Sequence, residues 1–180
     1  MRLFIAFGVP DDVKEYMAKV QGIIGGDLAG IRWVKKEQMH LTLKFLGEVQ
    51  PNTADKIKDE LRKIRFGPFN VYLSSIGVFP NENCIRVVWV GLEPEDKVIG
   101  LQMRIDENLE KLFKKEKDFK AHITLGRVKY ARGKELFFSK LKGIKVEKKK
   151  FIVDKFKLMK STLTAHGPVY ETVEEFGAQC

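Results

Sequence analysis

Cysteine and histidine are scarce in this chain of 180 residues, which contains two cysteines and three histidines. Cys84 adjoins an apolar run and Cys180 is the last residue, so the two do not form the disulfide framework of a small secreted domain. Their spacing does not match that of a metal site either. The chain is long enough to bury a core without covalent staples. We therefore expect a reduced, cytoplasmic protein.

Long hydrophobic runs and nucleotide-binding loops are also missing. The apolar stretch at residues 3–9 is barely long enough for a secretory signal and lacks a small-residue cleavage site. No other stretch approaches the length of a membrane span. No GxxxxGK[ST] motif occurs, and the glycines between residues 22 and 30 are typical of a turn after a helix. We expect no membrane association and no cofactor.

Positive charge predominates, with 33 Lys and Arg against 24 Asp and Glu and a net charge of +9. This excess favours polyanionic partners such as nucleic acid. Charged residues make up 32% of the chain, and a composition rich in Lys and Glu is also typical of a thermophilic protein. We interpret the basic run VEKKKF (146–151) as a solvated strand edge or turn in preference to an RNA-binding patch.

Hydrophobic periodicity predicts alternating strands and helices. Prolines followed by acidic or polar residues mark the expected helix starts. The helices are expected at residues 11–24, 51–65, about 95–112 and about 133–141. The strands are expected at residues 2–7, 31–34, 40–49, 69–78, 85–91, 122–127, 146–159 and 168–176.

The second half of the chain repeats the first. The stretch HLTL at residues 40–43 returns as HITL at 122–125, and FNVYLSSI (69–76) aligns with FIVDKFKL (151–158) at the same displacement of 82 residues. The repeats cover roughly residues 2–80 and 85–176 of a single bilobal domain spanning 1–180. Similar half-domains usually pack about a pseudo-two-fold axis. Equivalent residues near that axis then face each other across one cleft.

The repeated HxT motif has the residues needed for proton transfer. Because side chains alternate along a strand, His40 and Thr42 share one face, as do His122 and Thr124. One protonated and one neutral imidazole suit in-line displacement at phosphorus, since the nucleophile loses a proton and the leaving oxygen gains one. The two hydroxyls could hold the non-bridging oxygens. We favour this chemistry over a purely structural role for a copied strand.

Residues near the motifs are weaker candidates. Simple alternation places Lys44 on the His40 face, where it would add a positive charge. The same alternation places Phe45 on the opposite face, and it does the same for Arg127 unless the strand ends or bulges there. Trp33 and Phe45 could stack on a base, but aromatic residues in strands are usually part of the core.

A zinc site is the metal-dependent alternative. His40, His122 and His166 together could supply three ligands. His166, however, lies in the turn-like segment TAHGPVY and has no counterpart of the HxT motif. We therefore expect no metal site.

Three stretches resemble one known family: RWVKKEQMHLTLKFLGEV (32–49), AHITLGR (121–127) and GPVY (167–170). They are similar to the archaeal and bacterial RNA 2′,3′-cyclic phosphodiesterases, also called 2′-5′ RNA ligases, of the 2H phosphoesterase superfamily. The resemblance implies an α+β fold of two pseudo-symmetric lobes, each an antiparallel sheet with helices on the outside, and an active-site cleft between them. It implies metal-independent hydrolysis of an RNA-terminal 2′,3′-cyclic phosphate to a 2′-phosphate, with 2′-5′ ligation as a related transfer.

The same resemblance implies residue roles. His40 would be the general acid that protonates the leaving 3′ oxygen, and His122 the general base that activates water. Thr42 and Thr124 would hold the phosphate, and Arg127 occupies a position where relatives also have Arg. The near-identical motifs do not themselves distinguish acid from base.

The expected partners are RNA ends, tRNA among them, and the chain is expected to be a monomer because its lobes already pair pseudo-symmetrically. Two alternatives stay open. One is the same chemistry on a small cyclic phosphate or a 2′-5′ oligonucleotide. The other is a non-catalytic protein that binds RNA ends.

Overall fold

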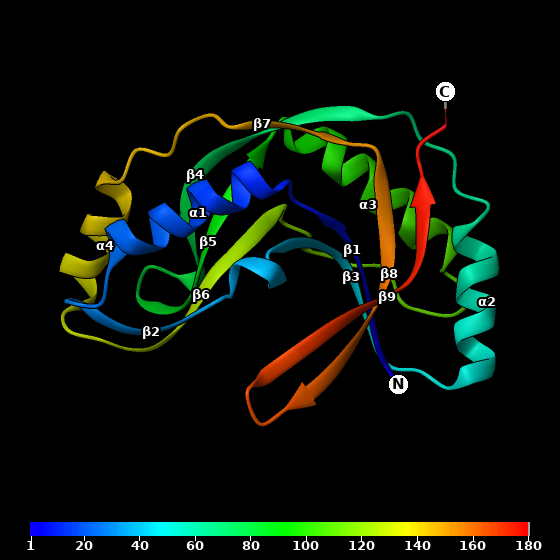
Figure 1. Cartoon of the computed structure of the whole chain (residues 1–180), viewed down its shortest axis with the longest axis horizontal. Helices are drawn as coiled ribbons and strands as arrows, with labels where there is room; N and C mark the ends of the chain where they lie inside the picture. Colours follow the sequence, from blue (N-terminus) through cyan, green and yellow to red (C-terminus); the bar gives the residue numbers. More distant parts are fainter. Residues whose placement is uncertain (180) are drawn as a thin grey trace.

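Antiparallel strand pairing dominates the structure, a computed structural model that describes residues 1–179; Cys180 lies outside the described residues. Nine strands in this range form one curled sheet in the order β7-β4-β5-β6-β3-β1-β8-β9, and β2 pairs with β6 (Figure 1). The strands are β1 Arg2–Gly8, β2 Ala29–Trp33, β3 His40–Glu48, β4 Phe69–Asn81, β5 Cys84–Glu93, β6 His122–Ala131, β7 Lys150–Val153, β8 Lys155–Thr164 and β9 Gly167–Gly177.

Four α-helices lie outside the sheet, α1 and α4 over one half and α2 and α3 over the other (Figure 1). They are α1 Asp11–Ile24, α2 Pro51–Leu61, α3 Glu95–Asn108 and α4 Lys134–Gly143, with a short 3₁₀ helix, η1, at Lys36–Gln38. Acidic residues in the first turns of α1 and α3 suit the positive ends of the helix dipoles. The expected α+β fold, with an antiparallel sheet and outer helices, is confirmed.

Several predicted elements have different bounds; the third helix, for example, ends at Asn108 where it was expected to reach about residue 112, and two further differences have a clear cause. The second helix was expected to reach residue 65, but α2 ends at Leu61 because Lys63 and Ile64 bond to carbonyls three residues back. This tighter turn directs Ile64 into the core. The strand expected at 146–159 is divided at Asp154, since β7 pairs with β4 whereas β8 pairs with β1.

Two strand pairs join equivalent positions of the repeats. Leu41 of β3 lies opposite Ile123 of β6, and Asn70 of β4 lies opposite Ile152 of β7. The partners in both pairs are 82 residues apart. A pseudo-two-fold axis that relates the repeats therefore passes through both pairs, which join the two halves of the sheet.

The halves also exchange elements. Strand β4, from the first repeat, pairs with β5 of the second, while β8 of the second repeat pairs with β1 of the first. Helix α1 contacts β6, and α3 contacts β3. The buried apolar side chains consequently form one continuous core from β1 to β9. Each half thus depends on the other for burial.

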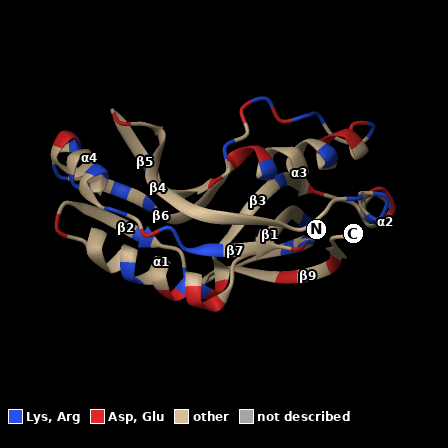
Figure 2. Cartoon of the chain, turned by 90° about the horizontal axis from the view of Figure 1, so that it is seen from above, with Lys and Arg blue, Asp and Glu red and all other residues tan. Residues whose placement is uncertain are grey.

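Charges of both signs are interspersed on the outer surface. Figure 2 shows Lys and Arg beside Asp and Glu on α2 and along the loop that follows α3. Pairs such as Lys148–Glu93 and Lys149–Glu147 occupy the basic run that was interpreted as solvated, and the Lys148 side chain is 74% exposed. Among residues 1–179, no helix is long and apolar enough to cross a membrane.

Candidate active site

The two HxT motifs meet where β3 joins β6. Leu41 and Ile123 are fully buried and pair across the junction. The flanking residues His40, Thr42, His122 and Thr124 are only partly buried, because alternation turns them to the other face of the sheet. His40 and His122 directly precede the paired Leu41 and Ile123, so the pairing places both imidazoles on the same face of the junction. The sequence-predicted histidines are therefore brought together.

Both imidazoles are held in the same way. Nδ1 of His40 lies 2.6 Å from the backbone oxygen of Gln38, and Nδ1 of His122 lies 2.7 Å from that of Lys120. A carbonyl only accepts, so Nδ1 carries the proton in each ring. Nε2 is then left for proton exchange. Nε2 of His40 is 2.9 Å from the Thr42 hydroxyl.

Aromatic rings enclose each histidine. Phe4 and Tyr170 lie 5.1 and 5.3 Å from the His40 ring, and Phe79 lies 4.8 Å from the His122 ring, edge to face. Burial lowers the pKa of both imidazoles, against the effect of the Nδ1 hydrogen bonds. The charge of Arg127 lowers the pKa of His122 further. Both rings are thus favoured in the neutral form until an anion arrives.

Equivalent β-bulges follow the two motifs; they overturn the predicted faces of Lys44 and Phe45 and provide the bulge on which the placement of Arg127 depended. Opposite β3, Ile5 and Ala6 pair with Lys44 and Thr42, which leaves the intervening residue without a partner; β6 has the same irregularity against β5. Each bulge shifts the alternation by one residue. Lys44 is consequently buried, whereas Phe45 and Arg127 turn to the histidine face. Phe45 is 69% exposed there.

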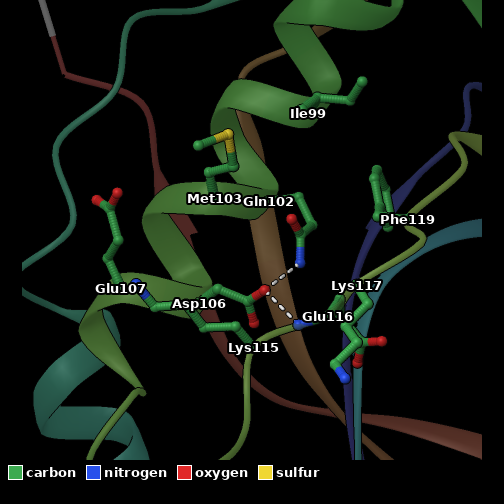
Figure 3. A pocket seen from close by; sticks show the side chains of 9 residues that line it. All are labelled: Ile99, Gln102, Met103, Asp106, Glu107, Lys115, Glu116, Lys117 and Phe119. Atoms are coloured by element: carbon green, nitrogen blue, oxygen red, sulfur yellow. Dashed lines mark hydrogen bonds between the residues drawn. The ribbon is translucent and has the colours of Figure 1, made fainter.

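Lys44 therefore adds no positive charge to the cleft. Its Nζ is 2.5 Å from a carboxylate oxygen of Asp106 and 2.8 Å from the backbone oxygen of Lys114. The Asp106 carboxylate also accepts hydrogen bonds from Gln102 and from the backbone N–H of Glu116, both at 2.8 Å (Figure 3). A cavity of about 300 Å³ beside this cluster is lined by α3 and residues 115–119, and neither histidine lines it.

Tyr170 is a site residue that the HxT motifs did not predict. Its ring packs against His40 and Phe4. The pKa of Tyr170 is raised, because burial outweighs the opposing effect of the charges of Arg127 and Arg2. The only sequence signal for it was the resemblance of GPVY (167–170). Tyr170 thus adds a residue of β9 to a site that β3 and β6 otherwise form.

The remaining candidates lie elsewhere. Trp33 is half-buried against the core, and its ring lies where a side chain on Gly126 would be. His166 is exposed in the turn between β8 and β9. Among residues 1–179, no three His, Cys, Asp or Glu side chains are grouped so as to hold a metal ion.

A bilobal fold with paired histidines between its halves is typical of a class of phosphoesterases. Comparison of the sequence with models of known families identifies the family within this class. The model of the LigT like phosphoesterase family matches the chain twice, over residues 7–89 and 90–170, and the chain belongs to this family. The resemblance read from the motifs is thereby confirmed.

Relatives match nearly the whole chain. An RNA 2′,3′-cyclic phosphodiesterase of Methanocaldococcus jannaschii is 40% identical over 98% of this chain and 100% of its own length. One of Archaeoglobus fulgidus is 36% identical over 98% of this chain and 99% of its own. Among solved structures, TT0787 of Thermus thermophilus superposes with a TM-score of 0.82 at 29% identity, covering 98% of this chain and 97% of the other. E. coli LigT complexed with phosphate has the same fold, with a TM-score of 0.78 at 24% identity and coverage of 99% and 98%.

Proposed function

We propose that this chain hydrolyses the 2′,3′-cyclic phosphate at an RNA end to a 2′-phosphate, without a metal ion. The observation that carries the proposal is the matched pair of imidazoles, each with Nδ1–H bonded to a backbone carbonyl and Nε2 left for proton exchange. The names of the relatives from Methanocaldococcus jannaschii and Archaeoglobus fulgidus support the substrate.

In the proposed reaction water attacks phosphorus in line with the 3′ oxygen. His122 takes the proton of the water at Nε2, the bond from phosphorus to the 3′ oxygen breaks, and His40 gives its Nε2 proton to that oxygen. The products are a 2′-phosphate and a 3′-hydroxyl. The assignment of acid and base follows the family resemblance, and the more solvent-accessible position of His122 supports it as the residue that activates water.

Threonine hydroxyls and one arginine would hold the phosphate. Thr42 and Thr124 flank the strand junction, and Arg127 reaches the histidine face through the second bulge. Donors fixed by the fold stabilise the charge that develops on the non-bridging oxygens. If an RNA 5′-hydroxyl replaces water, the same groups would join the ends by a 2′-5′ bond.

Two variants and one substrate test this proposal. Chelator-treated wild type, His40→Ala and His122→Ala are assayed on a short RNA with a 2′,3′-cyclic phosphate, and 2′- and 3′-phosphate products are separated. Wild type should form the 2′-phosphate, and each variant should lose about 10²–10⁴-fold in rate while its circular dichroism spectrum is unchanged. Full activity of either variant would refute the mechanism. Binding of the RNA without turnover would favour the non-catalytic alternative.

The proposed setting is the cytoplasm, where the chain would act as a monomer on RNA ends, tRNA among them. The exposed free thiol of Cys84 supports a reducing compartment. The exchange of β4 and β8 between repeats supports one bilobal domain, because neither repeat has a complete sheet of its own. Rates on matched short and long substrates would distinguish RNA ends from small cyclic phosphates.

A further inference from the structure

A second pocket, of about 260 Å³, lies between η1 and the tip of the β8–β9 hairpin. The hairpin projects beyond the sheet (Figure 1), because β1 pairs with β8 only at residues 157–161, whereas β8 and β9 stay paired to Thr164 and Gly167. The residues that line the pocket include Lys35, Glu37 and His166. None of these three residues takes part in the reaction described above.

The pocket is continuous with the candidate active site. Gln38 and Tyr170 both line it. The Gln38 carbonyl accepts the Nδ1–H bond of His40, and the Tyr170 ring lies edge-on to the same imidazole. The pocket therefore adjoins the candidate active site through these two residues.

We propose that this pocket binds the nucleotide that precedes the 3′-terminal one in an RNA substrate, an inference that rests on the proposed function. In an in-line reaction the leaving oxygen and its ribose lie on the side of the general acid, here His40. The RNA strand leaves that ribose through its 5′ oxygen. A pocket walled by residues that contact His40 lies where the strand continues.

The lining chemistry matches a ribonucleotide better than a free anion. Lys35 and His166 carry nitrogen donors suited to the connecting phosphodiester. The Glu37 carboxylate would repel a bare phosphate, but it can accept a hydrogen bond from a ribose 2′-hydroxyl, the group that distinguishes RNA from DNA. Pro168 and Tyr170 supply apolar surface for the sugar or base.

Hydrogen bonds hold the walls of the pocket together. The Gln38 amide donates to the backbone oxygen of Pro168, which ties η1 to the hairpin. The Thr164 hydroxyl donates to the backbone oxygen of Gly167 at 2.6 Å and accepts the backbone N–H of His166 at 3.2 Å. Walls that are fixed by such bonds lose less conformational entropy when a strand binds.

Two substrates with the same reactive end isolate this pocket. One is adenosine 2′,3′-cyclic phosphate, and the other is a dinucleotide that ends in it. Wild type should have a higher kcat/KM for the dinucleotide, since contacts remote from the reacting atoms promote catalysis. Lys35→Ala and His166→Ala should each remove about tenfold of the dinucleotide rate, the worth of one contact to a charged group, and little of the mononucleotide rate. A dinucleotide with a 5′ deoxyribose should lose part of the advantage in wild type and none in Glu37→Ala, which has no side-chain acceptor.

Lys36→Ala is the matched control, because Lys36 adjoins Lys35 in sequence but bonds to Glu15 and does not line the pocket. It should leave the ratio of the two rates unchanged. If wild type turns over neither substrate, the proposed function fails. If wild type turns over both equally, or if Lys35→Ala and His166→Ala change both rates alike, the function stands and the pocket assignment is wrong.

Discussion

The buried ion pair behind the candidate active site gives a sharp prediction for Lys44→Met. The Lys44 and Asp106 side chains are 2% and 6% exposed, and Nζ and the carboxylate are 2.5 Å apart. Methionine has a similar length but no charge, so the substitution leaves the Asp106 carboxylate buried without its cation. The hydrogen bonds from Gln102 and Glu116 remain.

The expected cost follows from this burial. Removing one partner of a buried pair typically lowers the free energy of unfolding by about 3–5 kcal/mol, whereas replacing both partners with apolar residues is often neutral. We therefore expect that loss for Lys44→Met and recovery of most of it in the double variant Lys44→Met/Asp106→Leu. Breaking the exposed pair Lys115–Glu110 by Lys115→Met should cost less than about 1 kcal/mol.

Urea unfolding of all four proteins at pH 7 provides the measurement. A loss below about 1 kcal/mol for Lys44→Met, or no recovery in the double variant, would refute the reasoning. A pH series adds a second readout. Burial raises the pKa of Asp106, but bonds from Lys44, Glu116 and Gln102 outweigh it and hold this pKa below its ordinary value. This stabilisation is present above the unfolded pKa and is lost as pH falls through the folded one. Lys44→Met should raise the folded pKa, so this variant should lose less stability between pH 7 and acid than wild type does, although it starts from a lower value.

Three further predictions concern the cleft. Burial lowers the pKa of both His40 and His122, so kcat/KM should be highest below about pH 6.5. Bound phosphate raises both pKa values, so kcat should peak at a higher pH. A kcat/KM optimum above neutrality would contradict this reasoning. Arg127→Gln removes a charge that lowers the pKa of His122, so the limb of the pH profile that reports His122 should move to higher pH while KM rises. Gly77→Ala would place a Cβ inside the space of the Trp89 ring, so it should lower the free energy of unfolding by about 1–3 kcal/mol and change tryptophan fluorescence. An unchanged spectrum and stability would show that the ring moves aside without cost.

Local sequence signals predicted much of this structure. Helix starts after Pro10 and Pro94, and strands at both HxT motifs, follow from turn chemistry and periodicity within a few residues. The repeat also placed His40 and His122 at equivalent points, since copies of one sequence pack alike. These features depend on neighbours in sequence.

The features that were missed depend on distant residues. Alternation in the stretch LTLKFLG placed Lys44 on the His40 face, whereas its burial depends on Asp106, which is 62 positions away. A bulge adds one residue to a strand without changing its composition, so Phe45 was assigned to the wrong face and Arg127 could be placed on the histidine face only on condition of a bulge. Tyr170 reaches His40 only because β9 pairs with β8 and β8 pairs with β1.

The pairing of Leu41 with Ile123 both joins the two halves of the sheet and sets the distance between the imidazoles. The histidines lie beside that pair, and exchanged strands bind the two halves elsewhere. Widening the site at this point would therefore separate Leu41 from Ile123 and break the pairing that joins β3 to β6. On heating, loss of activity should coincide with cooperative unfolding of the whole chain. Residual activity should therefore measure the fraction of protein that is still folded.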